Sequence, residues 1–345
     1  MEIRWNRDCR EYKGTQPCEV LRAEGYTSCA ECEYYDPKGT RILIIKLGAA
    51  GDVLRTTPLL SSIRKQYPQS HITWLTKTPN NELLYNTPFV DRILTLSYDT
   101  LSRLELEKFE VVYNFEIDLP AISIVTKITA DKKYGYYLAE DGHPAAYNQG
   151  AQYYLDRANS DTLNKNNKKT YQEMMHEVAE LPYTSQHYIL NLTPEEQQAS
   201  IEFRKHYAIA PEQKLVGINI GSGARWPGKS WGRKNIIEFI RTLNTPIVLL
   251  AGPEEPEDAQ DKMALKLHDY KWPILKNNPQ NTLREYMTRI NACDFVITGD
   301  TLTLHIALAL KKPTLALFFC TPPWEVEGYG ILTTVTSPSS PFPFE

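Results

Sequence analysis

Short apolar runs alternate with amphipathic segments over most of the chain, and the first series begins just after residue 40. The run Ile42–Ile45 is continuously apolar, as in a strand buried on both faces of a parallel sheet. Further strand-like runs are Ile72–Leu75, Arg92–Leu96 and Val111–Phe115, and Leu101–Lys108 has a helical pattern. Strands that alternate with helices indicate βα units and a parallel sheet.

A glycine turn follows the first of these strands and leads into an expected helix. The turn contains Gly48 and Gly51, and the apolar residues after it fit one face of a helix that opens at Asp52 and reaches Tyr67. A proline interrupts helical hydrogen bonding, so we expect this helix to end at Pro68.

A second alternating series begins at Lys214. Its expected strands are Leu215–Ile220, Ile247–Ala251, Asp294–Thr298 and Thr314–Phe318. Its expected helices are Lys234–Leu243, Glu257–Tyr270, Thr282–Ala292 and Thr303–Leu310. Between the two series the chain is more helical and polar, and Thr193 with Pro194 is typical of a capped helix start.

The two series predict an α/β protein with two Rossmann-like, doubly wound lobes. At 345 residues the chain is too long for one ordinary core, since domains hold roughly 100–200 residues. We expect a Cys-rich segment at 1–38, a first lobe at 39–193 and a second lobe at 194–345. When two such lobes face each other, the carboxyl ends of their strands point at a common cleft, where ligands bind.

Composition narrows the functional classes. The formal net charge is -4, from 38 basic and 42 acidic residues, which gives no basis for binding nucleic acid through bulk charge. No apolar run approaches the ~20 residues of a membrane span, and the N-terminus lacks the apolar core of an export signal. We expect a cytoplasmic protein, with peripheral contact to the inner face of the membrane and oligomer formation both left open.

Four of the six cysteines lie in the N-terminal segment with the spacing C-x8-C-x10-C-x2-C. In a reducing compartment, clustered thiols are interpreted first as metal ligands. A Cys-x2-Cys pair is typical of tetrahedral thiolate sites, so we expect a structural zinc or iron ion at Cys9, Cys18, Cys29 and Cys32. The alternative is unpaired or redox-active cysteines in a loosely ordered arm.

Asp52, directly after the first glycine turn, is the candidate catalytic residue of this motif. The turn has two glycines three residues apart and no Gly-Lys-Ser/Thr ending, so it is neither a dinucleotide fingerprint nor a P-loop. A carboxylate at the mouth of the cleft could take a proton from an acceptor hydroxyl. The structural alternative is a helix cap or first-turn acid, which spacing alone favours.

The loop after the first strand of the second lobe is suited to phosphate. It is rich in glycine, and around Ser222 and Gly223 it would present backbone N–H groups and hydroxyls. Arg225 and Lys229 in the same loop could meet phosphate oxygens. The alternative is a long solvated connection anchored by buried tryptophans.

Two further strand ends carry candidate ligands. Gly299, Asp300 and Thr301 end one strand, with His305 on the next helix, and hydroxyl, backbone N–H and imidazole at a helix N-terminus suit a diphosphate. The structural alternatives are an N-cap role for Thr301 and a core position for His305. Glu254, after another strand, could bind sugar hydroxyls or serve as the N-terminal charge of the next helix.

Taken in order, these motifs resemble glycosyltransferase family 9, the heptosyltransferases of lipopolysaccharide assembly. The resemblance runs from about Arg41 to Tyr329 and is strongest over Ile45–Leu60. It implies a GT-B type fold and makes Asp52 the counterpart of the family's proposed catalytic base.

The resemblance also assigns the motifs of the second lobe. Lys229 falls on the lysine of the donor-diphosphate loop, and Glu254 on the acid of a strand-end turn that contacts the donor. Gly299, Asp300 and Thr301, with His305, resemble the Asp-Thr-Gly-x-x-His element that holds the nucleotide-sugar phosphates. Leu302 stands where the commonest version of that element has glycine.

Residues and resemblance together predict an inverting sugar transferase whose donor, by resemblance, is ADP-heptose. Lys229, Ser222 and the helix N-terminus at Thr301 would stabilise the departing diphosphate, so that no catalytic metal is obligatory. Asp52 would deprotonate the acceptor hydroxyl, with Glu116 and Asp118 as the fallback bases.

The sequence does not identify the acceptor, which could be core lipopolysaccharide, another glycan, a lipid-linked glycan or a protein side chain.

Two other functions are alternatives. A sugar-nucleotide epimerase would need an acid and a base on both faces of the sugar, and only Asp52 is well placed for such a role. A non-catalytic scaffold on a degenerate fold is the second.

Overall fold

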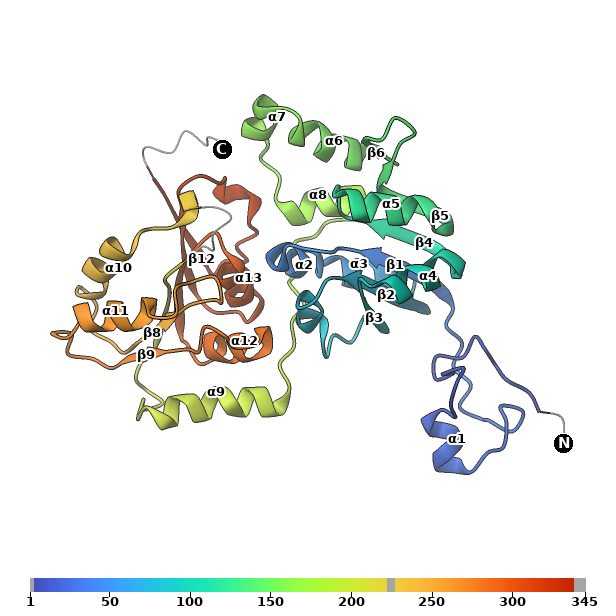
Figure 1. Ribbon diagram of the computed structural model, residues 1–345, viewed down its shortest axis with the longest axis horizontal. Coiled ribbons are helices and arrows are strands. Elements are labelled where there is room, and N and C mark those ends of the chain that lie inside the picture. The colour runs from blue at the N-terminus through green and yellow to red at the C-terminus, as the bar shows by residue number, and fades with distance from the viewer. Residues whose placement is uncertain (1–2, 222–226, 338–345) are drawn as a thin grey trace.

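The computed structural model describes residues 3–221 and 227–337, and in this part of the chain two α/β lobes are each built on a six-stranded sheet (Figure 1). The first sheet has the strand order β3-β2-β1-β4-β5-β6, in which only β6 is antiparallel to its neighbour. The second has the order β12-β11-β10-β7-β8-β9 and is parallel throughout. The predicted fold class, two doubly wound lobes, is confirmed.

The strands of the first sheet are β1 Thr40–Ile45, β2 Ser70–Thr76, β3 Arg92–Thr95, β4 Lys108–Asn114, β5 Thr129–Leu138 and β6 Pro144–Ala146. The strands of the second are β7 Val216–Asn219, β8 Ile247–Leu250, β9 Ile274–Lys276, β10 Phe295–Gly299, β11 Thr314–Phe318 and β12 Leu332–Thr336.

The helices up to the end of the first lobe are α1 Glu19–Glu24, α2 Ala50–Thr56, α3 Leu59–Gln66, the 3-10 turn η1 Asn80–Leu84, α4 Tyr98–Leu106, α5 Leu119–Lys127, α6 Gln149–Ala158, α7 Asp161–Asn166 and α8 Tyr171–Val178. Those that follow are α9 Pro194–His206, η2 Pro227–Lys229, α10 Arg233–Ile240, α11 Ala259–Lys266, α12 Leu283–Asn291, α13 Leu302–Ala309 and η3 Pro323–Glu325.

The continuous apolar run of β1 is explained by burial on both faces. Ile42 and Ile44 belong to one core cluster, whereas Leu43 and Ile45 belong to another on the opposite face of the sheet, and all four are fully buried. The first of these clusters also contains residues of the second lobe, such as Leu304 on α13. The two lobes therefore share one apolar core where α2 packs against α13.

The single helix expected from Asp52 to Tyr67 is wrong, because the chain forms α2 and α3 with a break at Pro58. Pro58 has no N–H to donate to the carbonyl of Leu54, four residues earlier. That carbonyl accepts instead from the backbone N–H of Thr57 at 3.1 Å and from its hydroxyl at 2.7 Å. Because of this break, only the short helix α2 remains of the N-terminal half of the predicted helix, and it packs against α13 of the second lobe.

The helix that follows the long connection between the lobes starts where the sequence predicts. Thr193 caps α9 and forms a reciprocal capping box with Glu196, and Pro194 is its first helical residue. α9 packs against α12 of the second lobe, where the hydroxyl of Ser200 donates to the carbonyl of Thr288 at 3.0 Å.

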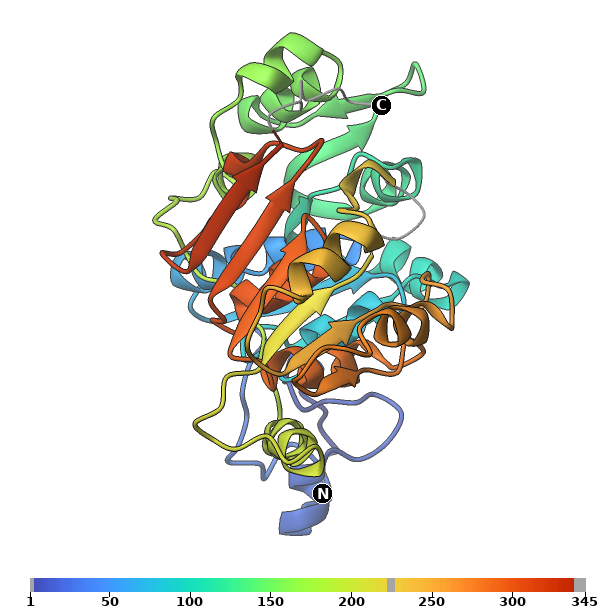
Figure 2. The same ribbon diagram turned by 90° about the vertical axis from the view of Figure 1, so that its left-hand side faces the viewer.

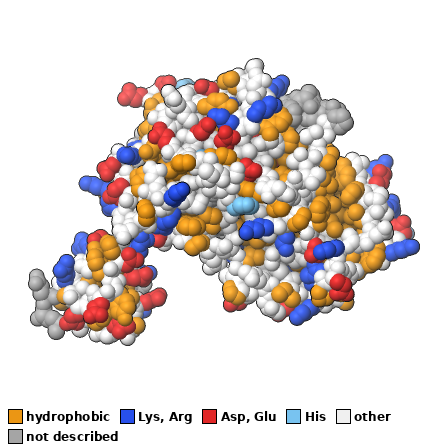
Figure 3. Space-filling model, turned by 180° about the vertical axis from the view of Figure 1, so that it is seen from behind, with side chains coloured by type: hydrophobic (Ala, Val, Ile, Leu, Met, Phe, Trp, Pro, Cys, Tyr) orange, Lys and Arg blue, Asp and Glu red, His pale blue; other side chains and the backbone are white. Residues whose placement is uncertain are grey.

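Residues 3–39 form a separate segment beside the first lobe (Figure 1). In both ribbon views the segment lies at the end of the molecule opposite α6 and α7 (Figure 2), and it projects from the body in the space-filling view (Figure 3). Arg10 anchors it, donating to the carbonyl of Ser70 at 2.6 Å and pairing with Asp91 of the first lobe.

Candidate functional site

The two lobes meet at the N-terminal ends of α2 and α13, and glycine is required at the contact. A Cβ atom at Gly51 would lie 2.9 Å from Cδ2 of His305, closer than carbon atoms normally approach. Gly51 therefore lets α2 approach α13 across the interface, a role that its place in the glycine turn did not reveal. The motifs predicted around Asp52 and Thr301 come together here, although they lie in different lobes (Figure 1).

Asp52 lies in the first turn of α2, but it is not the cap of the helix. The N-cap is Ala49, and no side chain caps this helix. The Asp52 carboxylate is 3.4 Å from the guanidinium of Arg55, one turn along, and its side chain keeps 37% of its surface exposed. Asp52 is thus not the N-cap but the first-turn acid of the structural alternative, and its carboxylate is accessible at the lobe interface.

Glu116, a fallback base, holds the glycine turn. Its carboxylate accepts from the backbone N–H groups of Leu47 and Gly48 at 3.0 and 2.9 Å, and lies 3.1 Å from the ammonium of Lys46. Burial raises the pKa of Glu116, although Lys46 and the Gly48 N–H oppose this effect. These partners make Glu116 a structural support of the turn. Asp118, the other fallback, is exposed at the N-cap of α5.

Lys229, Asp300 and His305 form a buried cluster on the second lobe. The ammonium of Lys229 is 2.6 Å from one carboxylate oxygen of Asp300, and Nε2 of His305 is 3.9 Å from the other. Nδ1 of His305 is hydrogen-bonded to the hydroxyl of Tyr188 at 3.0 Å. Gly299 permits the arrangement, because a Cβ there would lie 2.9 Å from the carbonyl oxygen of Lys229.

The charges of this cluster follow from burial and from its neighbours. Burial alone would raise the pKa of Asp300, but Lys229, His305 and Arg55 lower it to about 2. Burial and Arg55 lower the pKa of His305 to about 3, against the opposing effects of Asp300 and Asp52. At neutral pH Asp300 is therefore a carboxylate and His305 a neutral imidazole. Asp52 and Arg55 of the first lobe act on this cluster electrostatically.

Thr301 is the N-cap residue of α13, as its spacing suggested, but its hydroxyl does not cap the helix. The hydroxyl is 3.0 Å from that of Thr298. Leu302 is the first helical residue, and its side chain packs against the shared core. The backbone N–H groups at the start of α13 thus lie beside the Lys229–Asp300 pair, which suits them to bind an anion.

Part of the predicted phosphate loop lies outside the described residues, namely Ser222, Gly223 and Arg225. Of the strand-end acids, Glu254 is exposed. Its neighbour Glu255 is turned inward, with its carboxylate 3.4 Å from Arg233, and a Cβ at Gly221 would collide with it.

Three residues of the interface were missed from the sequence. Lys46 is buried directly after β1, and a lysine that ends an apolar run is a signal that could have found it. Arg55 lies 4.1 Å over the ring of Tyr171, and it donates to the carbonyl of Glu325 in the second lobe at 3.0 Å. Its position one turn after Asp52 is the only sequence signal for it. Tyr188, which holds His305, carries no such signal.

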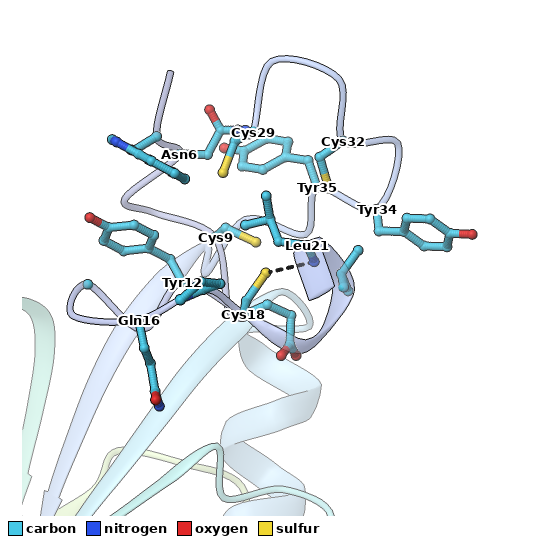
Figure 4. Close-up of a pocket in the computed structure, with 15 residues that line it drawn as sticks. Asn6, Cys9, Tyr12, Gln16, Cys18, Leu21, Cys29, Cys32, Tyr34 and Tyr35 are labelled. Atoms are coloured by element: carbon cyan, nitrogen blue, oxygen red, sulfur yellow. Dashed lines mark hydrogen bonds between the residues drawn. The ribbon is translucent and has the colours of Figure 1, made fainter. Parts of the chain in front are cut away.

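Cys9, Cys18, Cys29 and Cys32 come together around one pocket of about 350 Å³ in the N-terminal segment (Figure 4). The metal ion expected from their spacing stays a prediction. Among residues 3–221 and 227–337, no three His, Cys, Asp or Glu side chains are grouped so that they could hold a metal ion. In the close-up, Cys29 and Cys32 lie on the upper loop, and Cys9 and Cys18 lie below them (Figure 4).

No helix within the described part of the chain combines the length and the apolar character needed to cross a membrane.

The arrangement at the lobe interface has two chemical capacities. Asp52 provides an accessible carboxylate that can accept a proton. On the other lobe, Lys229 and the start of α13 provide an ammonium and backbone N–H donors that can neutralise a developing negative charge.

Residues 88–340, well over half of the chain, match the model of glycosyltransferase family 9 (heptosyltransferase). Lipopolysaccharide heptosyltransferase 1 of Campylobacter coli is 22% identical over 305 residues, 82% of this chain and 84% of that protein. Lipooligosaccharide heptosyltransferase 2 of Haemophilus influenzae is 23% identical over 307 residues, again 82% of this chain and 84% of that protein.

Solved structures share the fold. A family 9 glycosyl transferase of Veillonella parvula superimposes with a TM-score of 0.68 at 19% identity, covering 86% of each chain. E. coli ADP-heptose lps heptosyltransferase II gives 0.65 at 18% identity, over 86% of this chain and 90% of that one. The E. coli heptosyltransferase WaaC, solved with ADP, gives 0.57 at 14% identity, over 87% and 91%.

Proposed function

This chain belongs to glycosyltransferase family 9 and is a glycosyltransferase, and we propose that it is an inverting heptosyltransferase with ADP-heptose as its donor. This donor is supported by the two heptosyltransferase relatives, by the likeness to the E. coli ADP-heptose lps heptosyltransferase II and by the likeness to WaaC, which was solved with ADP. Neither the epimerase nor the scaffold alternative has comparable support.

One observation carries the proposed mechanism. α2 and α13 meet at Gly51 and His305, so that Asp52 from one lobe and the Lys229–Asp300 pair from the other border the same interface. A transferase of this kind needs a proton acceptor near the acceptor sugar and positive charge near the leaving diphosphate, and the two lobes supply one each.

The step proceeds as a single displacement. Asp52 takes the proton of the acceptor hydroxyl while the hydroxyl oxygen forms a bond to C1 of the heptose. The bond between C1 and the phosphate oxygen breaks on the opposite side, and ADP leaves with the electron pair, which inverts the configuration at C1. Lys229 and the N–H groups of α13 stabilise the negative charge on the departing diphosphate. Asp300 is a positioning residue, since its carboxylate holds Lys229.

The acceptor we propose is a hydroxyl of a lipopolysaccharide-type core oligosaccharide. The two relatives named above support this class, since one is a lipopolysaccharide heptosyltransferase and the other a lipooligosaccharide heptosyltransferase.

The proposal is tested by binding and transfer with the purified full chain. Because the proposed donor site is specific for adenine, calorimetry with ADP, UDP and GDP should show that ADP binds about tenfold more tightly, or better, than the other two. Incubation with ADP-heptose and truncated core oligosaccharides should add one heptose to an acceptor, with the opposite anomeric configuration to that of the donor. Equal affinity for the three nucleotides, together with no transfer from ADP-heptose, would contradict the proposal.

A further inference from the structure

The N-terminal segment has too few apolar side chains to hold its own fold. Within residues 3–39, the buried apolar side chains are Cys9, Cys18 and Leu21. Large side chains such as Trp5 and Tyr34 remain about half exposed, at 47% and 55%. Segments of this size are normally stabilised by disulfides or by a structural metal ion.

The thiols of the segment point into one cavity. The sulfur atoms of Cys29 and Cys32 point down from the upper loop, and those of Cys9 and Cys18 lie below them, with all four turned toward the interior (Figure 4). All four cysteines are free of disulfide bonds. Aromatic and aliphatic residues complete the wall, namely Trp5, Tyr12, Leu21, Tyr34 and Tyr35, and of the four cysteines Cys9 and Cys18 are buried.

Backbone hydrogen bonds form turns at these cysteines. The N–H of Cys32 donates to the carbonyl of Cys29 at 3.4 Å, which closes the Cys-x2-Cys turn. The N–H of Tyr12 likewise donates to the carbonyl of Cys9 at 3.2 Å. The sulfur of Cys18 accepts from the backbone N–H of Leu21 at 3.5 Å, so it already acts as a hydrogen-bond acceptor, as metal thiolates do.

We infer that these four cysteines bind one structural metal ion, zinc or iron, that closes the N-terminal segment. The pocket contains no histidine, and the ligand set is therefore all thiolate, which selects soft metals. In such a site each thiolate lies about 2.3 Å from the ion and about 3.8 Å from the other thiolates. Binding draws the two walls of the pocket together. Cys29 and Cys32 lie outside helices and strands and can move without breaking either, whereas Cys9 is held by an isolated antiparallel bridge to Pro37.

The inference is independent of the proposed transfer reaction, because the pocket lies in the N-terminal segment, away from the α2–α13 contact (Figure 1). Removal of the ion should therefore lower the stability of the segment without changing the donor affinity of the lobes.

Elemental analysis of the full chain, purified with reductant and without chelator, is the first test. We expect close to one zinc or iron ion per chain, with visible absorption only in the case of iron. The double variant Cys29→Ser/Cys32→Ser should lose at least nine-tenths of the ion. The matched control Cys293→Ala, which removes a thiol buried in the second lobe, should keep it.

A titration of the chelator-treated chain with Co2+ gives a second readout that does not depend on the metal acquired in the cell. One equivalent should produce the intense thiolate-to-cobalt absorption of a tetrahedral site, and the double variant should lack it. The inference is overturned if the reduced wild-type chain contains no ion and gives no cobalt spectrum. It is equally overturned if the double variant keeps the ion, or if the four cysteines prove to be paired in disulfides.

Discussion

The carboxylate of Asp300 holds the ammonium of Lys229 in a position where it can bind an anion. The Asp300 carboxylate is buried, with its side chain 13% exposed, and it pairs with an ammonium that is 19% exposed. An incoming diphosphate would share that ammonium, so Asp300 fixes the position of Lys229 while the remaining N–H donors stay available.

Replacement of Lys229 by alanine should weaken the binding of ADP by about 1.5–3 kcal/mol, which is the scale of a hydrogen bond to a charged group. Calorimetry with ADP measures the change. The control is Lys234→Ala, since that side chain is 89% exposed on the neighbouring helix α10. Unchanged affinity in Lys229→Ala would remove this residue from the donor site.

His305 makes a separate prediction about pH. Its pKa is about 3 in the folded chain and about 6.5 in an unfolded chain, so between these values the unfolded state binds more protons. The contribution of His305 to the free energy of unfolding is therefore fully present above pH 6.5. It is lost as the pH falls toward 3, by up to about 1.4 kcal/mol per pH unit.

Denaturant unfolding between pH 7 and pH 4 tests this dependence. His305→Gln should reduce the loss of stability with falling pH, with the remainder due in part to the half-buried His71 and the buried His176. A substitution of the exposed His268 by glutamine should leave the loss as in the wild type. If His305→Gln keeps the full pH dependence, the histidine is not held neutral by burial.

At the scale of elements, the contact between α2 and α13 depends on glycine at position 51, which has no side chain. Alanine at position 51 would favour the helix by up to about 1 kcal/mol, but its Cβ would lie 2.9 Å from the ring of His305. Overpacking of this kind typically costs about 1–3 kcal/mol, so the clash should outweigh the helical preference.

We therefore predict that Gly51→Ala lowers the free energy of unfolding by about 1–2 kcal/mol, as measured by denaturant unfolding. The matched control for stability is Gly252→Ala, because no atom lies within 4 Å of a Cβ at that position. A Gly51→Ala protein as stable as the wild type would mean that α2 and α13 can separate without loss.

The sequence predicted the buried strands well and missed strands that are more exposed. β1, β8 and β11 are continuous apolar runs because both faces are covered, and this signal is local. β5 reads Thr-Ala-Asp-Lys-Lys-Tyr-Gly-Tyr-Tyr-Leu, with charged residues where it is exposed, so its pattern does not separate it from a loop. β12, at the sheet edge, is also mostly exposed and was missed.

The candidate site was predictable only in part, for a similar reason. Asp52, Asp300 and Thr301 lie in strand-end motifs, whose position follows from the parallel sheets. That Glu116 supports the glycine turn, and that Asp300 holds Lys229, depends on side-chain contacts between distant segments. Such contacts leave no periodic trace in the sequence.

At the scale of the whole molecule, the lobes are joined by charged residues as well as by the shared core. Arg157 on α6 pairs with the carboxylate of Glu325 on η3, which lies 168 residues away, and Arg55 donates to the carbonyl of Glu325. The Arg157 side chain is only 7% exposed and that of Glu325 20%. A buried charge that loses its partner is costly, so this pair couples the lobes.

Arg157→Met should lower the stability of the chain by about 3 kcal/mol, because it leaves the Glu325 carboxylate partly buried without its guanidinium partner. Differential scanning calorimetry should show a lower transition temperature, and the double variant Arg157→Met/Glu325→Gln should recover part of the loss. Lys127→Met is the control, since its pair with Glu105 is exposed. Equal melting of Arg157→Met and Lys127→Met would show that the interlobe pair contributes nothing.

The central claim is that Asp52 on the first lobe is the base for a transfer whose donor is bound by the second. Turnover and ADP affinity of Asp52→Asn, measured side by side with the wild type, test it most directly. General-base catalysis contributes roughly 10²–10⁴-fold, so turnover should fall by about that factor. The affinity for ADP should stay close to normal, because the asparagine keeps the shape of the side chain and the donor site is on the other lobe. Near-wild-type turnover in Asp52→Asn would contradict the account.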